Sequence, residues 1–329
     1  MPWRVPPAAR QDGVQPNPYH VWLSEVMLQQ TTVAAVTDYF RKFIARWPTV
    51  FDLAAARDED VMAAWAGLGY YARARNLLKC ARVVAGEMDG QFPDTIEALC
   101  DLPGIGPYTA GAIAAIAFDR PASVVDGNVE RVMARLFAEE EALPLAKKRL
   151  QDHAAALTPA QRPGDYAQAV MDLGATICTP RKPACILCPW RGSCAGHAAG
   201  IAETLPRRAP KTAKPVRQAI AWAAFSATGA VFCIRRPPRG LLGGMLALPA
   251  TAFSSKSGPP DQTPPCAGDW ETLGEVRHTF THFHLAMEVR RSTVAVEPAI
   301  NGAVGYVNPA QAVEGMPTLF AKALALATN

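Results

Sequence analysis

The sequence predicts a multidomain protein, with an all-α domain followed by a smaller α+β domain. Its 329 residues are enough for two separate hydrophobic cores. From residue 18 to about residue 200, apolar residues recur at helical spacing in segment after segment, and period-two strand patterns are nearly absent. After residue 200 the pattern changes to short strand-like runs. We therefore expect domains at 1–205 and 218–329, joined by a linker at 206–217.

Proline and glycine separate the expected helices of the first domain, for example at Pro48, Pro93 and Pro163. A short apolar run with strong helical periodicity lies between each pair of these breaks. The expected helices cover residues 20–47, 59–88, 94–102, 109–118, 128–137 and 166–178.

The linker and the second domain have a different composition. From Leu205 to Gln218 there are five lysines or arginines, three prolines and no acid, which is typical of an exposed, semi-stiff tether. A stretch rich in Gly, Pro and Ser at 251–268 is expected to be a loop. The expected strands cover residues 219–226, 230–236, 280–296 and 303–307.

Charge and hydropathy narrow the class of protein. The formal net charge is +4, a mildly basic value that permits nucleic-acid binding without requiring it. No free stretch of about 18 uncharged apolar residues indicates a membrane span. The first ten residues lack the apolar core of an export signal. We therefore expect a cytoplasmic protein with no membrane partner.

Four of the eight cysteines fall within 17 residues, which favours a metal site over disulfides in a chain with no export signal. Six, two and five residues separate consecutive members of this group, so it contains one Cys-x-x-Cys step. On ligand chemistry alone, both zinc and an iron–sulfur cluster fit. Cations in the loop, such as Arg181, are candidates for phosphate contact. The candidate ligands are Cys178, Cys185, Cys188 and Cys194.

The stretch "LPGIGPYTAGAIAAIAF" begins at Leu102 with a turn and continues as a helix of small apolar residues. Gly104 and Gly106 let the backbone turn sharply and approach another chain. The helix begins near Thr109, so its free N–H groups form a candidate phosphate site. An ordinary joint between two helices is the alternative. Tyr108 stands at the helix start, where a lysine could act as an amine nucleophile but a tyrosine cannot form a Schiff base.

Two carboxylates are candidate catalytic groups. Asp126 lies in "VVDGNVERV" directly before a helix, where it could also simply cap that helix. Glu25 lies inside a helix with apolar neighbours, Trp22 and Leu28, on its own face. It could be an ordinary surface residue, but burial would raise its pKa and let it hold a proton near neutral pH. A protonated carboxyl and an ionised one are the usual pair for cleaving a glycosidic bond.

Five motifs taken in order resemble the helix-hairpin-helix DNA glycosylases with an iron–sulfur cluster, and specifically the adenine DNA glycosylases of the MutY family. They are "SEVMLQQT", "GLGYYARARNL", "LPGIGPYTAGAI", "DGNVERV" and the four-cysteine run. The resemblance is close over residues 1–200 and looser beyond them. It implies a 4Fe-4S cluster on the four cysteines.

The resemblance also implies roles for the candidate residues. Glu25 matches the acid that protonates the leaving adenine, and Asp126 the anion that stabilises the positive sugar. Tyr108 and Asn128 match residues that line and brace the site. Relatives similar to endonuclease III carry a lysine where Tyr108 stands, so the tyrosine implies a monofunctional enzyme. The implied DNA contacts are Gln30, Tyr70, Arg73, Gly104, Gly106, Thr109 and Arg181, with Gln30 and Tyr70 as wedges in the base stack.

In the second domain, "GLLGGMLALP" and "HTFTHFHL" resemble motifs of a Nudix-like domain that reads 8-oxoguanine opposite the adenine. The implied reading tip is Phe280, Thr281 and His282; a plain strand is the alternative reading. No close glutamate cluster for Mg²⁺ occurs in this part of the sequence, so hydrolysis of free nucleotides is not expected.

The resemblance implies a monomer that acts on duplex DNA with adenine opposite 8-oxoguanine or guanine. Two other functions stay open. One is a bifunctional glycosylase and lyase for oxidised pyrimidines, and the other is a DNA-binding module without catalysis. The proline-rich stretch after Trp3 and Arg4 is longer than the family pattern, so the sequence does not place these two residues.

Overall fold

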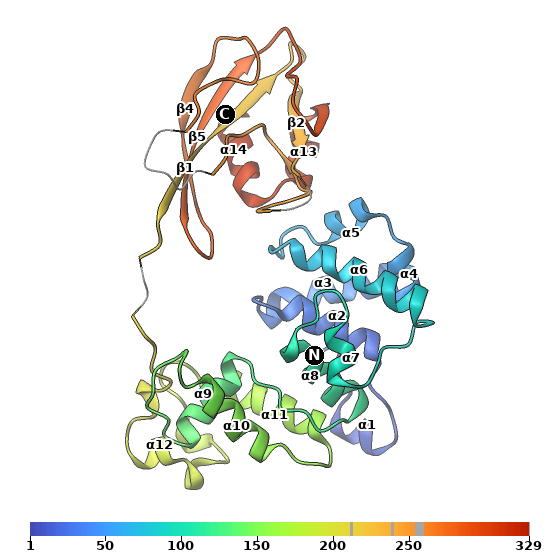
Figure 1. Ribbon diagram of the computed structural model, residues 1–329, viewed down its shortest axis with the longest axis vertical. Coiled ribbons are helices and arrows are strands. Elements are labelled where there is room, and N and C mark those ends of the chain that lie inside the picture. Colours follow the sequence, from blue (N-terminus) through green and yellow to red (C-terminus); the bar gives the residue numbers. More distant parts are fainter. Residues whose placement is uncertain (211–212, 238–239, 254–259, 329) are drawn as a thin grey trace. The chain divides into compact units, whose positions relative to one another are not determined.

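The computed structural model describes residues 1–210, 213–237, 240–253 and 260–328. Contacts divide the chain into two compact units, Met1–Ala56 with Asn76–Lys211 and Arg57–Arg75 with Thr212–Asn329 (Figure 1). Because residues 57–75 group with the C-terminal part, the domain boundaries expected at 205 and 218 stay predictions. Residues 211–212 of the expected linker and 254–259 of the expected loop lie outside the described residues.

The N-terminal two thirds of the chain are helical, as expected. The helices are α1 (Pro7–Gln11), α2 (Pro18–Leu28), α3 (Val33–Arg46), α4 (Val50–Ala55), α5 (Asp58–Ala64), α6 (Ala72–Glu87), α7 (Ile96–Cys100), α8 (Pro107–Phe118), α9 (Gly127–Leu136), α10 (Lys147–Leu157), α11 (Pro163–Thr176) and α12 (Ala195–Ala198). The helix expected at 59–88 is two helices, because Gly67 and Gly69 adopt positive φ between them. α10 was not expected, since it buries only Leu150 and Ala154.

Local chemistry sets where the helices of the site begin. α2, α8 and α11 each have a proline in the first turn, where its missing N–H leaves no helical bond unmade. Asn17 caps α2 by accepting the N–H of Tyr19. Asp126 caps α9 by accepting the N–H groups of Asn128 and Val129.

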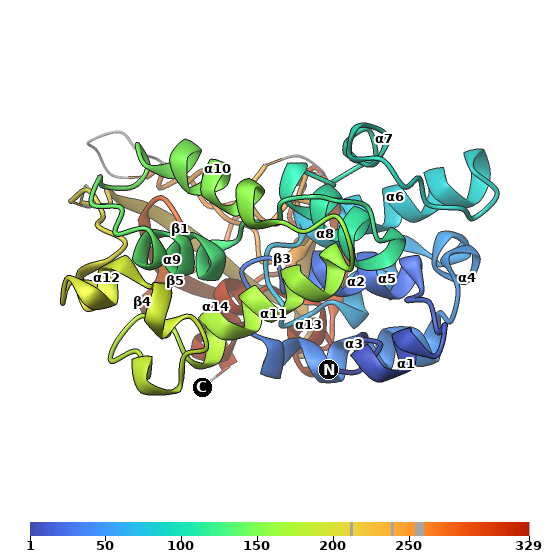
Figure 2. The same cartoon turned by 90° about the horizontal axis from the view of Figure 1, so that it is seen from below.

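α8 is the central helix of the first unit, and α2, α7 and α11 pack against it. It is rich in alanine and glycine, and residues 109–117 are all buried. Gly164 of α11 approaches it so closely that a Cβ there would lie 2.4 Å from the carbonyl oxygen of Ala115. α11 also packs against α9, so that α8, α11 and α9 lie side by side (Figures 1 and 2). This close packing brings the N-termini of α8 and α9 to one side of α11.

The C-terminal part forms a mixed sheet of order β3-β2-β1-β5-β4, with β6 paired to β2. β1 and β5 run parallel, and the other pairs are antiparallel. α13 (Pro309–Gly315) packs on β2, and α14 (Thr318–Thr328) packs on β1, β4 and β5. The strands are β1 (Val216–Phe225), β2 (Val231–Arg235), β3 (Leu246–Ala247), β4 (Glu271–Thr279), β5 (His284–Thr293) and β6 (Ala303–Val307).

The α+β class expected for the second domain is confirmed, with two differences in its strands. The strand expected at 280–296 begins at His284, because residues 280–283 form a turn closed by the N–H of Phe280 donating to the Phe283 carbonyl at 2.9 Å. β4 was not expected, since Val276 is its one fully buried residue. Among the described residues, none of the helices combines the length and the hydropathy that a membrane span requires.

Candidate active site and iron–sulfur loop

The first unit contains a pocket of about 1030 Å³. Its wall is built from the segment before α2, from α2 itself, from the turn before α8, and from α8, α9 and α11. Glu25, Tyr108, Asp126 and Asn128, which the sequence places far apart, all line it. The fold therefore brings the four expected catalytic residues to one cavity.

Glu25 lies on the part of this wall that α2 forms. Its side chain is 6% exposed, and every residue of α2 from Val21 to Met27 is buried with it. Burial raises the pKa of Glu25 from 4.5 to about 7, since the charged form loses its hydration. The nearby Asp126 also raises this pKa, whereas a hydrogen bond from Tyr108 and the charge of Arg4 lower it. The carboxyl can therefore hold or release a proton near neutral pH.

Tyr108 reaches the pocket from the first turn of α8. Its hydroxyl donates to Oε2 of Glu25 at 3.2 Å and lies 3.6 Å from the sulfur of Met171. Burial, followed by the charges of Glu25 and Asp126, raises the pKa of this phenol far above its usual range. The side chain is therefore a neutral hydrogen-bond donor that orients Glu25.

Asp126 both caps a helix and lines the pocket, so its two sequence interpretations are compatible. Oδ1 accepts the backbone N–H groups of Asn128 and Val129 at 2.9 and 2.8 Å. Oδ2 accepts the side-chain amide of Asn128 at 2.9 Å. These bonds, together with the positive end of the α9 dipole, stabilise a negative charge facing the pocket.

Arg131 is a site residue that the sequence reasoning missed. Its guanidinium donates to Oδ1 of Asn128 at 2.9 Å and to the carbonyls of Gly174 and Cys178, each at 2.7 Å. It therefore fixes the amide that bonds to Asp126. The signal was available in the sequence, since Arg131 lies on the buried face of α9 between Val129 and Val132.

Two polar residues of α11, Gln168 and Asp172, also line the pocket and were not expected. With Met171 and Ala175 they occupy positions i, i+3, i+4 and i+7, which form a single helix face. That spacing was visible in "YAQAVMDLGAT". Trp3 and Arg4, which the sequence did not place, line the pocket as well.

The turn before α8 has the shape expected of a phosphate site. Gly104 has φ of 78°, and a Cβ there would lie 2.6 Å from Cβ of Asn76, so glycine is required. Gly106 is the N-cap of α8, has open space where a Cβ would stand, and leaves the first N–H groups without a side-chain cap. The side chain of Thr109 is buried and its hydroxyl accepts from Gln29 at 3.1 Å. Thr109 can therefore offer a phosphate its backbone N–H.

The two expected wedge residues share an unusual backbone. Gln30 has φ of 57° and Tyr70 has φ of 48°, and both side chains are exposed. Non-glycine residues in this region carry strain, which often marks functional sites. Arg73 lies beside Tyr70, with its guanidinium 5.5 Å from the ring centroid, and donates to the Leu68 carbonyl at 3.0 Å. Burial lowers the pKa of Arg73 to about 10.

The four clustered cysteines surround one small cavity beyond the end of α11. Arg135, which is 2% exposed, donates to Sγ of Cys178 at 3.2 Å and to the carbonyl of Thr179 at 2.8 Å. A buried cation beside several thiols suits a group held by thiolates. The described part of the chain contains no three His, Cys, Asp or Glu side chains placed to hold a single ion. A four-iron cluster does not need that geometry, because each cysteine binds a different iron atom.

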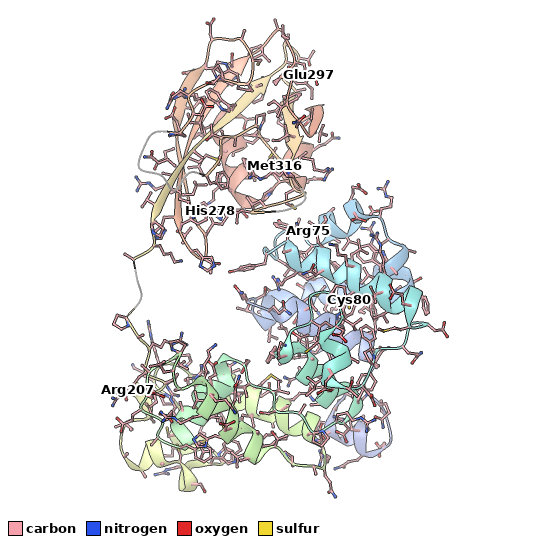
Figure 3. All side chains as sticks on the ribbon, viewed as in Figure 1. Arg75, Cys80, Arg207, His278, Glu297 and Met316 are labelled. Atoms are coloured by element: carbon pink, nitrogen blue, oxygen red, sulfur yellow. The ribbon has the colours of Figure 1, made fainter. Side chains whose placement is uncertain are left out.

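In the second unit, the expected reading tip is the turn between β4 and β5. Thr281 and His282 are exposed at its end, and Phe280 packs against Phe283 with ring centroids 4.8 Å apart. His278 on β4, labelled in Figure 3, lies at the base of the turn and packs edge-on against Phe280, with centroids 4.6 Å apart.

Three family models match segments of the chain. The model of the HhH-GPD superfamily base excision DNA repair proteins matches residues 23–158, and a NUDIX domain matches residues 220–326. The iron–sulfur binding domain of endonuclease III matches residues 178–194. This last match decides between zinc and iron–sulfur in favour of a 4Fe-4S cluster, and Cys178, Cys185, Cys188 and Cys194 all lie within the matched residues.

Curated relatives agree with the family models. The chain is 48% identical to an adenine DNA glycosylase of Rattus norvegicus over 60% of this chain and 39% of the relative. It is 35% identical to an adenine DNA glycosylase of Mus musculus over 91% of this chain and 68% of the relative. The aligned part thus spans less than half of the rat relative's length.

Among solved structures, the chain is similar to a thermostable thymine-DNA glycosylase. The two are 32% identical, with a TM-score of 0.51, over 56% of this chain and 85% of the other. The fold of more than half of this chain therefore recurs in a glycosylase named for a different base.

Proposed function

The chain belongs to the adenine DNA glycosylase family, and from this premise we propose that it is a monofunctional glycosylase. It excises adenine paired with 8-oxoguanine or guanine from duplex DNA and leaves the sugar–phosphate backbone intact. One observation carries the proposal. Glu25, whose pKa burial raises to about 7, and Asp126, whose carboxylate accepts three N–H bonds, line the same pocket.

The proposed chemistry begins with proton donation by Glu25. Breaking the N-glycosidic bond leaves electrons on the adenine ring, and a proton at a ring nitrogen neutralises them. A group that releases its proton near pH 7 suits this step. The hydrogen bond from the Tyr108 hydroxyl at 3.2 Å holds the Glu25 carboxyl in one orientation.

Asp126 acts on the other product of the same bond cleavage. The sugar becomes an oxocarbenium ion, and a fixed carboxylate beside it stabilises the positive charge. Asn128 and Arg131 restrict the Asp126 carboxylate, since they form one hydrogen-bonded chain that ends on it. Little reorganisation is then needed as the charge develops.

Tyr108 also excludes lyase chemistry at its position. A β-lyase forms a Schiff base between an amine and the sugar, and a phenol cannot form one. After base release, the abasic site should therefore persist until alkali or another enzyme cleaves the strand.

The turn before α8 and the cysteine loop bind the phosphates of the DNA backbone. The uncapped N–H groups in the first turn of α8 donate hydrogen bonds to a phosphate at the positive end of the helix. The 4Fe-4S site pins the loop that carries the exposed Arg181, a second phosphate contact. Gln30 and Tyr70 enter the base stack and help adenine to leave it. The exposed Thr281 and His282 read the base opposite adenine.

A glycosylase assay on four duplexes tests the proposal, with adenine opposite 8-oxoguanine, guanine, cytosine or thymine. We expect adenine release with the first two, and strand cleavage only after alkali treatment. Borohydride trapping serves as the second arm. A stable protein–DNA adduct, or strand cleavage without alkali, would show the bifunctional alternative instead. Duplex binding without base release by the parental protein would indicate the non-catalytic alternative.

A further inference from the structure

The segment before α2 carries two arginines that reach the same helix. Arg4 donates to Asp172 at 2.5 Å, and Arg10 donates to Asp165 at 3.2 Å. The two acids are seven residues apart on α11, which is about two helical turns. Because the later arginine meets the earlier acid, the segment runs antiparallel to α11. We call residues 1–17 the N-terminal strap.

The Arg10 end of the strap is the better shielded of the two attachments. The side chains of Arg10 and Asp165 are 11% and 14% exposed, whereas Asp172 is 44% exposed. Arg10 also donates at 3.2 Å to Asp119, the residue that ends α8 in a left-handed conformation. One guanidinium thus ties the strap to α8 and α11, which both line the pocket. Shielded ion pairs are screened less by salt than exposed ones.

The strap is stiff between its two arginines. Pro6 and Pro7 have restricted φ angles, and α1 begins directly at Pro7. The backbone N–H of Arg10 donates to the Pro6 carbonyl at 3.0 Å. A displacement at Arg10 is therefore carried along the backbone to Arg4, which faces the pocket.

We propose that Arg10 is a positioning residue for base release, because its ion pairs with Asp165 and Asp119 hold Arg4 against the pocket. Arg10 itself does not line the pocket. The inference rests on the proposed function, since it takes Glu25 as the acid whose surroundings Arg4 sets.

A loosened strap has a specific consequence for Glu25. The groups whose charge or hydrogen bond acts on the carboxyl are Arg4 from the strap, Tyr108 from α8 and Asp126 from α9. Asp172 from α11 and the amino-terminal Met1 also line the pocket. Arg4 is the cation among the groups that act on the carboxyl, and its charge lowers the pKa of Glu25. When Arg4 moves away, that pKa rises. Glu25 then stays protonated to higher pH, while the pocket wall is less well placed for adenine.

The test compares Arg10→Gln with the parental holoenzyme, using the visible absorbance of the cluster to verify folding. We expect single-turnover adenine release to slow about tenfold, because modest misplacement of a binding group has effects of this order. Duplex affinity should change less than about twofold, since Arg10 does not face DNA in the proposed site. The alkaline limb of the pH–rate profile should move up by about half a pH unit.

Matched variants separate positioning from general damage. Arg10→Lys should recover most of the rate. Asp165→Asn should slow release in the same direction as Arg10→Gln, and Arg162→Gln is its control, because Asp165 also pairs with Arg162 at 2.7 Å. The double variant of Arg10→Gln with Asp165→Asn should be no slower than either single one. Arg41→Gln, which breaks an exposed pair with Asp38 on α3, is the control and should behave as the parent.

Hydrogen exchange tests the strap without relying on activity. Arg10→Gln should speed amide exchange in residues 4–14 and leave α8 unchanged. Unchanged amide exchange in the strap would overturn the proposal that the Arg10 ion pairs hold the strap in place. Faster exchange with a parental rate and an unmoved alkaline limb would overturn the positioning role. If the parental protein releases no adenine from any duplex, the proposed function fails. The hydrogen-exchange result still decides whether the Arg10 ion pairs hold the strap. If Arg10→Gln does not fold, Asp165→Asn is judged by the same criteria.

Discussion

Two walls of one pocket carry the same chemical group in opposite surroundings. On the α2 wall, Glu25 is enclosed by buried residues, and its pKa rises to about 7. At the start of α9, Asp126 accepts three N–H bonds and faces the pocket from the positive end of a helix. The α2 wall stabilises a neutral acid, and the α9 wall stabilises an anion.

One pocket can therefore hold a proton donor and a fixed anion that are both carboxyl groups. Burial without strong partners favours the protonated carboxyl, whereas fixed N–H donors favour the carboxylate. The four predictions that follow test one wall at a time.

Glu25→Gln should have the largest effect. The amide keeps the shape of the side chain but has no acidic proton to donate, so we expect adenine release to slow by about 10³-fold. Duplex binding should be retained. Single-turnover kinetics and a binding titration on adenine opposite 8-oxoguanine measure both quantities. Glu87→Gln, at the exposed end of α6, is the control. If Glu25→Gln releases adenine at the parental rate, Glu25 is not the catalytic acid.

Asp126→Asn should slow release by about 10²-fold, because it removes the anion and keeps the helix cap. Asparagine caps helices as well as aspartate does, so the melting temperature should change little. Asp126→Ala removes the cap as well and should lower stability by about 1 kcal/mol. Thermal melts beside the kinetic assay separate the two contributions. If Asp126→Asn matches the parent in rate, the residue is a structural cap alone.

The pH dependence of the rate of adenine release should follow the protonation of Glu25 on α2. Glu25 is protonated below its pKa of about 7 and loses its proton above it. The rate should therefore stay level at lower pH and fall about tenfold per pH unit at higher pH. Single-turnover rates between about pH 4 and 9 give the profile. A limb near 4.5, the ordinary value, would mean that Glu25 is solvated in the complex with DNA.

Tyr108→Phe should have the smallest effect. It removes the hydroxyl that donates to Glu25 and that lowers the pKa of this carboxyl. We expect a rate loss of about two- to fivefold, together with an alkaline limb at higher pH than in the parent. The same profile measured on the variant checks both. If the alkaline limb of the pH–rate profile moves to lower pH instead, Tyr108 does not donate a hydrogen bond to Glu25.

Sequence patterns predicted most of the residues that line the pocket, but not that these residues meet in one cavity. The Asp-Gly turn before a periodic segment predicted the cap at Asp126, and the glycine turn predicted the start of α8. Glu25 was ambiguous, because one polar residue on an apolar helix face can be exposed or buried. Gln168 and Asp172 were missed, since their helical spacing says which face they share and not what that face meets.

Some features depend on contacts between distant segments, which local sequence patterns do not specify. β4 has a mostly exposed pattern and is a strand because β5 supplies its partner. Arg131 matters because it meets Asn128 and two carbonyls from another part of the chain. The strap is held by pairs more than 100 residues apart in the sequence.

Residue types and their spacing were enough to predict a helical first part and an α+β second part. They also gave the group of four cysteines and the absence of an amine at position 108. These follow from residue type and short-range spacing, which act within a few turns of chain. Tertiary structure alone decided that Glu25 is buried, that Asp126 shares its pocket, and that Arg4 reaches them. The reason is that a carboxyl's proton affinity depends on the water and charges around it, and folding brings those charges from remote segments.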